Sequence, residues 1–184
     1  RIRRELSLNS GLTHLPAKNT IQASVAGESL SLDELYGTVF GVKRPEIFNL
    51  DLSRQELESV PSDILRFSSL TELNLSHNRI ARIPSDISRL TDLSHLNLSH
   101  NRISSLPGQL GELKELFQLD LSYNQLSCLP SSICGMQSLI ELNLSHNHLK
   151  EVPLCLGSIS GLARLDLRGN CLTELPEILL KLEG

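Results

Sequence analysis

The sequence predicts an α/β solenoid, an open stack of short repeats that curves into a horseshoe with a parallel β-sheet on its concave side. Two observations carry this prediction. Leucine supplies 40 of the 184 residues, more than half of the apolar content, which is typical of a repeat and not of a mixed core. The chain also aligns with itself at a 23-residue period, without insertion or deletion, over residues 47–184.

Residues 1–46 precede the regular repeats and form a predicted N-terminal flank. Residues 6–16 resemble half a repeat, and residues 17–30, which are small and polar, are expected to form a loop. A capping box (Ser-Leu-Asp-Glu) and apolar residues at helical spacing then predict an amphipathic helix over about residues 32–41. This helix is expected to cap the first repeat, since the end of a solenoid exposes a hydrophobic edge. The alternative is a helix that docks a partner.

Six 23-residue blocks follow, each with the pattern LxxLxLxxNxLxxLPxxIxxLxx. In the third block, Leu96 and Leu98 alternate with Asn97, and this period of two predicts a half-buried strand. Strands that stack at about 4.8 Å each form a parallel sheet. Its outward-facing side chains are expected at the second, third, fifth, seventh and eighth places of each block.

An asparagine and a proline recur at fixed places in the blocks. Asn101 and its equivalents are expected to pair with backbone groups of neighbouring turns and form a buried ladder; the first block has Gln55 instead. Pro107 and its equivalents lack an N–H and have a fixed φ, which prevents a second ladder. The return segment is therefore expected to be short, either helical or extended, with Leu110 and Leu113 turned inward.

The repeat length, the LPxxI phrase and the absence of cysteine caps resemble the intracellular class of leucine-rich repeats. This class is found in Ras-pathway scaffolds, Ras-suppressor proteins, Scribble-like polarity proteins and plant intracellular Ras-group repeat proteins. The resemblance covers residues 47–184 well and residues 1–46 poorly. It implies a cytoplasmic, non-catalytic interaction scaffold in intracellular signalling, without a cofactor. It also implies a protein partner on the concave face, such as a small GTPase or a phosphatase or kinase component.

Composition excludes several other functions. The net charge of −4 argues against a generically basic nucleic-acid binder, and the short apolar runs argue against a membrane span. The sequence has no GxxxxGK[ST], GxSxG or HExxH motif, and Ser99 next to His100 lacks the third group that a catalytic relay needs. We therefore predict no enzyme, no nucleic-acid partner and a monomeric fragment.

Residues at the same place of successive blocks form a column along the sheet. The eighth column varies more in residue type than the other outward-facing columns, and its rings on adjacent repeats are expected to lie close enough to stack. The fifth and seventh columns are monotonous, which favours a solvated framework. The predicted partner-binding residues are Arg54, His77, Arg79, Asn97, His100, Arg102, Phe117, Asp120, Tyr123, Asn143, His146 and Arg168.

Within this set, two features favour binding. A basic strip of arginines and histidines, which also includes Arg82, can pair with carboxylates or phosphates, although Glu56, Glu58 and Glu72 nearby would make it an ordinary charged surface. Phe117 and Tyr123 are candidate hot-spot anchors, unless Phe117 is partly buried. The histidines at the eighth place also suggest a zinc site or a pH switch. No carboxylate or cysteine is spaced to join them as a metal ligand, so no metal is predicted.

Cysteines and glycosylation sequons bear on the compartment. The four cysteines show no CxxC spacing and are expected to be free thiols. Sequons at Asn74, Asn97 and Asn143 all arise from the repeated phrase LNLSHN and are expected to be accidental.

Two alternatives to a scaffold stay open. The sequence begins at Arg1 and ends at Gly184 within a repeat, so we expect a fragment of a longer protein. The chain is then the recognition arm of a multidomain kinase, GTPase or ubiquitin ligase. The second alternative is a secreted protein or receptor ectodomain.

Overall fold

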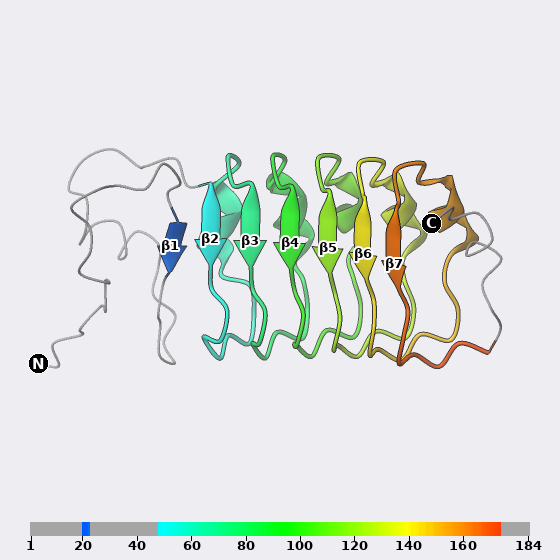
Figure 1. The fold of residues 1–184 in the computed structure, drawn as a ribbon. Coiled ribbons are helices and arrows are strands. Elements are labelled where there is room, and N and C mark those ends of the chain that lie inside the picture. The colour runs from blue at the N-terminus through cyan, green and yellow to red at the C-terminus, as the bar shows by residue number, and fades with distance from the viewer. Residues whose placement is uncertain (1–19, 23–47, 174–184) are drawn as a thin grey trace, which may run out of the picture.

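The computed structural model describes residues 20–22 and 48–173. Its described strands form one parallel sheet in chain order, and β1 does not pair with β7, so the sheet is open (Figure 1). The strands are β1 (Thr20–Gln22), β2 (Asn49–Asp51), β3 (Glu72–Asn74), β4 (His95–Asn97), β5 (Gln118–Asp120), β6 (Glu141–Asn143) and β7 (Arg164–Asp166).

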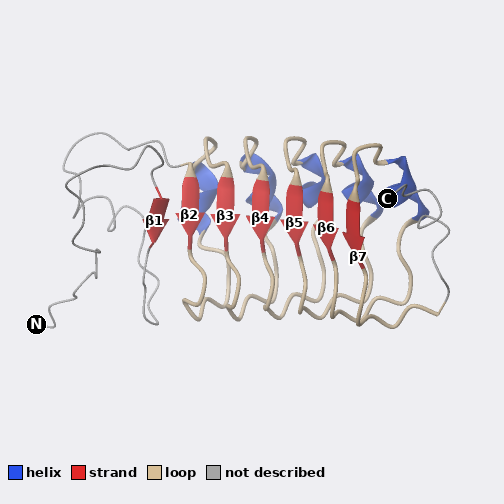
Figure 2. Cartoon of the chain, in the orientation of Figure 1, coloured by secondary structure: helices blue, strands red, loops and turns tan. Residues whose placement is uncertain are grey.

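Short 3₁₀ helices lie behind the sheet and form the opposite side of the solenoid (Figure 2). They are η1 (Ser62–Arg66), η2 (Ser85–Arg89), η3 (Gly108–Glu112), η4 (Ser131–Gly135) and η5 (Leu154–Ser158). Each helix follows a proline of the LPxxI phrase; Pro107, for example, has φ −71° and ψ 146°. Proline fixes φ and has no N–H to donate to a ladder, so the chain turns into a single tight helical segment instead of a second sheet.

The 23-residue period is the register of the sheet. Asn49 pairs with Glu72, and Glu72 pairs with His95, so equivalent residues stand side by side on consecutive rungs, a rung being one strand with its return segment. The leucines between these residues are buried: Leu73 and Leu96 are each 1 % exposed. Removal of this leucine column from water is the main favourable contribution to folding.

The asparagine ladder is present and is buried. In Asn101, Nδ2 donates to the carbonyl oxygens of Leu75 and Leu98, at 2.9 and 3.0 Å. Its Oδ1 accepts the backbone N–H of Ile80 at 3.0 Å. One side chain thus bonds to backbone groups of its own rung and of the preceding rung, and it supplies the acceptor that the buried N–H of Ile80 needs. Asn78, Asn124 and Asn147 make the same set of bonds to preceding rungs.

One prediction for the N-terminal flank is wrong. Residues 17–30 were expected to form a loop, but Thr20–Gln22 forms β1, in which Ile21 pairs with Leu50 of β2. The sheet edge explains the difference. Without β1, the edge of β2 that faces away from β3 would present a row of unpaired N–H and C=O groups. The predicted half repeat at residues 6–16 and the predicted helix at residues 32–41 lie outside the described residues.

The prediction of four free thiols is also wrong. Cys134 in η4 and Cys155 in η5 form a disulfide with a Cα–Cα distance of 5.7 Å. Their sequence separation of 21 is close to the period of the solenoid, which brings consecutive 3₁₀ helices side by side and places the two Cα atoms within the range that a disulfide spans. Cys128 and Cys171 are free and exposed.

We expect Asn124→Ala to lower the free energy of unfolding by about 3 kcal/mol, because it leaves the buried N–H of Ile103 without its acceptor. It also removes one of the hydrogen bonds that the carbonyls of Leu98, Leu121 and Ser122 accept, although each of these carbonyls keeps another donor. Urea unfolding followed by circular dichroism measures the loss. The neighbouring Gln125 is exposed, so the control Gln125→Ala should change stability by less than about 0.5 kcal/mol. Equal losses in both variants would contradict the ladder's role.

Candidate functional site

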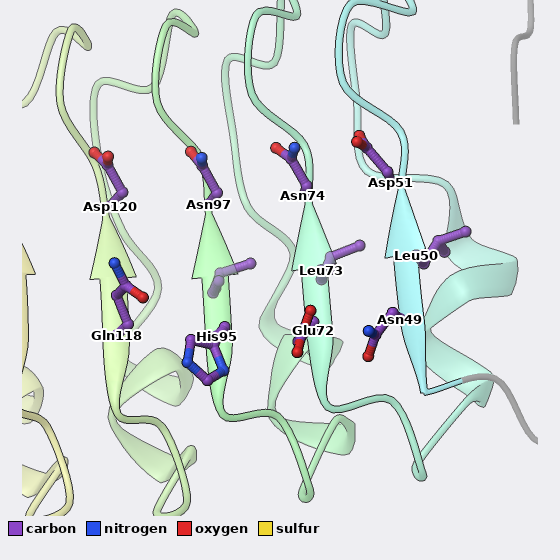
Figure 3. Close-up of a pocket in the computed structure, with 11 residues that line it drawn as sticks. Asn49, Leu50, Asp51, Glu72, Leu73, Asn74, His95, Asn97, Gln118 and Asp120 are labelled. Atoms are coloured by element: carbon purple, nitrogen blue, oxygen red, sulfur yellow. The ribbon is translucent and has the colours of Figure 1, made fainter. Parts of the chain in front are cut away.

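The concave face of the sheet carries two rows of polar side chains and a shallow hollow of about 320 Å³ over β2 to β5. Figure 3 shows the rows one above the other, with residues from four strands on the same face. The third places of the blocks supply Asn49, Glu72, His95 and Gln118, and the fifth places supply Asp51, Asn74, Asn97 and Asp120. The hollow is open, so it is suited to a protuberance of a larger molecule.

Side chains at the fifth place of the blocks form hydrogen bonds with the backbone. The Oδ1 atoms of Asn97 and Asp120 accept the N–H two residues later, at 3.0 and 2.8 Å, and Asn143 does the same at 3.1 Å. Asn143 Nδ2 also donates to Asp120 Oδ2 at 3.4 Å. These bonds agree with the interpretation of the column as framework.

The seventh column differs from prediction. Ser76 and Ser99 are only 5 and 6 % exposed, so in the turns after β3 and β4 this place is buried and does not face the solvent. The carbonyl of Ser99 accepts the N–H of His77 at 2.9 Å and Asn101 Nδ2 at 3.2 Å, which ties the residue into the ladder. Ser122 and Ser145 are buried in the same way.

Arg168 is the exception in this column, and its side chain is 85 % exposed. Its guanidinium donates to both carboxylate oxygens of Asp166, with the shortest bond at 2.6 Å. These hydrogen bonds hold the pKa of Asp166 below its usual value. The charge of Arg168 is therefore largely matched within its own rung.

The eighth column forms a continuous stack of four rings. The ring centroids of His77 and His100 are 4.1 Å apart, those of His100 and Tyr123 are 4.3 Å apart, and those of Tyr123 and His146 are 4.2 Å apart. The interplanar angles are between 9° and 14°. We call these four residues the ring stack, and the predicted proximity of their rings is thereby confirmed.

Backbone conformation places the rings in this row. All four residues have a positive φ, from 53° to 56°, a conformation that is uncommon for residues other than glycine. Each of them directly precedes a ladder asparagine, and the N–H of His100 donates to the carbonyl of Ser122 on the next rung at 2.9 Å. Repetition of this turn aims every ring at its neighbour.

The ring stack ends against a glycine. Gly169 has φ +67°, and a Cβ atom at this position would lie 2.7 Å from Nδ1 of His146. The missing side chain therefore lets the last ring lie directly on the backbone of the sixth rung. At the other end, Arg54 occupies the eighth place of the first rung with φ 58°.

Stacking affects the titration of the central histidine. Burial, and then the neighbouring His77, lower the pKa of His100, and His146 adds to this effect while Asp120 opposes it. The folded state therefore favours the neutral imidazole. Because its pKa is lower in the folded state than in the unfolded state, His100 makes the free energy of unfolding depend on pH. Its contribution to stability is fully present above its ordinary pKa and is lost as pH falls through the lowered value.

The predicted arginines separate into paired and unpaired side chains. Arg79 Nη2 lies 3.1 Å from Oε1 of Glu56, whereas Arg54 and Arg102 form no ion pair with another described residue. Both are exposed. Arg82 lies farther along the chain, in an isolated bridge with Ser105, and so is removed from the ring stack.

Apolar side chains are exposed where the strands begin, at the opposite end from the ring stack. Phe117 and Ile140 are 41 and 44 % exposed and stand on neighbouring rungs, joined by a hydrogen bond from Ile140 N–H to the Phe117 carbonyl at 2.8 Å. Phe117 is thus accessible as a hot-spot candidate. Sequence reasoning missed Ile140 and the exposed Phe48, which share the second place of their blocks with Phe117 and could have been found from that column.

Neither a candidate metal site nor a candidate membrane span is found among the described residues. Across the described residues, no group of three His, Cys, Asp or Glu side chains is placed to hold a metal ion. None of the described helices is long and apolar enough to span a bilayer.

A family model described as leucine rich repeat matches residues 45–103, 68–126 and 100–149. The chain belongs to the leucine-rich repeat family. This agrees with the repeat pattern and with the asparagine ladder. A search of curated proteins found no match.

Several solved structures share the fold. A leucine-rich-repeat protein of Leptospira interrogans matches with 33 % identity and a TM-score of 0.71, over 74 % of this chain and 35 % of its own. A TDR receptor matches with 34 % identity and a TM-score of 0.69, over 74 % of this chain and 25 % of its own.

A third structure is the ectodomain of the plant membrane receptor kinase GASSHO1/SCHENGEN3 from Arabidopsis thaliana, in complex with CASPARIAN STRIP INTEGRITY FACTOR 2. It matches with 35 % identity and a TM-score of 0.68, over 74 % of this chain and 17 % of its own. The chain thus spans about a third or less of the length of these three structures.

We expect Gly169→Ala to lower the free energy of unfolding by about 1–2 kcal/mol, because a side chain at positive φ is strained and the added Cβ displaces the ring of His146. The measurement is thermal unfolding followed by circular dichroism. Gly161 is the matched control, since a Cβ there meets no atom closer than 3.7 Å. Unchanged stability in Gly169→Ala would show that the end of the ring stack tolerates a side chain.

Proposed function

We propose that the chain is a non-catalytic protein-protein interaction module that binds a partner protein on its concave face. The observation that carries the proposal is the exposed ring stack beside the open polar hollow. Tyrosine and arginine are enriched at the energetic centres of protein interfaces, and both stand on this face. Membership of the leucine-rich repeat family supports the same function.

The size of the face suits a protein and not a small molecule. The seven described strands, spaced about 4.8 Å apart, give a surface on the order of 25–30 Å long, which can supply a standard interface of about 800 Å² per partner. A small-molecule site is normally a cleft that encloses most of its ligand, whereas the hollow over β2 to β5 is open. A macromolecular partner therefore fits the geometry better.

The proposed setting is intracellular. The 23-residue repeat with its LPxxI phrase resembles repeats of cytoplasmic signalling scaffolds, so a small GTPase or a phosphatase or kinase component is the proposed class of partner. The chain spans 35 % or less of three related structures, which is compatible with the alternative of a recognition arm in a larger signalling enzyme.

A second candidate function, a secreted or receptor ectodomain, is favoured by the disulfide. Disulfides persist in oxidising compartments and are rare in the cytosol, and Cys134 and Cys155 are bonded to each other. Two of the structures with the same fold are a receptor and a receptor-kinase ectodomain bound to another factor. The function on this interpretation is still partner binding, on the outer side of a membrane.

Loss of binding on the concave face tests the proposed function. We expect the variant Arg54→Glu, His100→Glu, Tyr123→Ala and His146→Ala to lose the protein that the wild type captures from an extract, because these changes remove the ring stack and reverse charge beside it. Quantitative mass spectrometry of the captured proteins is the measurement.

The matched control changes charge on the opposite side of the solenoid, with Arg66→Glu in η1 and Arg89→Glu in η2, both exposed. This control should retain the partner, and circular dichroism should show that both variants fold. Retention of the same proteins by the concave-face variant would overturn the proposed function.

The state of the cysteines in the native protein distinguishes the two settings. In an oxidising compartment, Cys134 and Cys155 should resist alkylation until a reductant is added, while Cys128 and Cys171 react at once. Alkylation during cell lysis, followed by peptide mass spectrometry, is the measurement. Prompt alkylation of all four cysteines would support the cytoplasmic setting and exclude the ectodomain.

A further inference from the structure

We infer that the ring stack, together with Arg54 and Arg102, binds a carboxylate-rich segment of the partner protein, and that protonation of its histidines strengthens this binding as pH falls. The inference rests on the proposed function, because it assumes that the concave face is the binding surface. It adds the chemistry of the partner and a means of regulation.

The first argument is the concentration of titratable groups in one row. His77, His100 and His146 occupy three of four consecutive rungs, and the centroids of His77 and His100 are 4.1 Å apart. Two imidazolium rings at this distance repel each other, and burial together with the neighbouring His77 disfavours the protonated form of His100 in the free protein. A bound anion removes part of this repulsion, and protonation and binding then reinforce each other.

The second argument is the balance of charge around the row. Arg54 and Arg102 are exposed and have no carboxylate partner among the described residues, while Arg79 is matched by Glu56 at 3.1 Å. Two exposed arginines, one at the eighth place of the first rung and one two residues after His100, are therefore available to an external carboxylate.

The carboxylates that face the histidines are already engaged. Asp120, which acts on His100, uses Oδ1 to accept the N–H of Ser122 at 2.8 Å. Asp166, which acts on His146, is held by the guanidinium of Arg168. Tyr123 lies between His100 and His146. Asp120 still attracts a protonated His100, and an external carboxylate adds to this attraction.

The third argument is the shape of the charge distribution. Counting protonated histidines, cations stand on the first, second, third and fifth rungs of the row, with adjacent rungs about 4.8 Å apart, and they do not converge on one point. A single phosphate is best held by donors that converge on it, often in a bidentate pair. An extended segment with several acidic side chains fits the row better, since it can place a carboxylate against each successive rung.

A peptide of alternating Glu and Gly residues, labelled with fluorescein, is the probe for this inference. Fluorescence anisotropy at constant ionic strength gives its Kd for the 184-residue chain at about pH 7.5 and about pH 5.5, a range that spans the ordinary histidine pKa. We expect Kd to fall about tenfold at the lower pH, which corresponds to a pKa shift of about one unit on binding. A peptide of alternating Lys and Gly residues should bind weakly at both values.

The decisive variant keeps the rings and removes their titration: His77→Tyr, His100→Tyr and His146→Tyr. Tyr123 already occupies this place with φ 53°, the same φ as His100, so the stack should persist. We expect this variant to bind the acidic peptide with the same Kd at both pH values. The control His148→Gln removes an exposed histidine outside the ring stack and should respond to pH like the wild type.

Several outcomes would overturn the inference. These are no binding of the acidic peptide at either pH, an undiminished pH response in the tyrosine variant, or displacement of the peptide by inorganic phosphate at matched ionic strength. Thermal unfolding at both pH values confirms that each variant is folded. If the acidic peptide fails while the concave-face variant still loses its captured partner, this inference is wrong and the proposed function stands.

Discussion

The buried amide of one asparagine per rung is the interaction on which the rest of the structure depends. Asn101 bonds to a carbonyl 26 residues earlier and to an N–H 21 residues earlier. Contacts on both sides of the 23-residue period fix how far one rung is displaced from the previous one. The leucines meet leucines only because this displacement is constant, so the core and the ladder specify the same register.

The same ladder determines the binding surface. A turn that carries the asparagine inward places the preceding residue at positive φ, and this residue projects where the strand ends. The chemistry of the concave face is therefore ordered along the strand direction. Exposed apolar side chains such as Phe117 precede the strands, polar side chains lie on them, and rings and arginines follow them. A partner that lies across the rungs meets one chemical class in each row.

Most of this arrangement could be predicted from the sequence, because a constant repeat length converts spacing in the chain directly into neighbours in space. The stacking of His77 on His100 and the pairing of Asn101 with other rungs are both consequences of that period. Prediction failed where the deciding partner is a local backbone group or lies outside the regular blocks. Ser99 faces inward because its carbonyl belongs to the ladder, and Thr20–Gln22 forms a strand because the edge of β2 needs a partner. The disulfide was missed because no short motif marks it, although the separation of its two cysteines is nearly one full period.

Covalent linkage of η4 to η5 has a consequence for how the solenoid carries load. A rung touches mainly its neighbours, so tension applied along the stack passes through each interface in series, and the weakest interface opens first. The Cys134–Cys155 bond takes one interface out of this series and makes two rungs extend as one element. A partner that pulls on the concave face would then find a stiff segment at β5 and β6 and a more compliant one at β2 to β4.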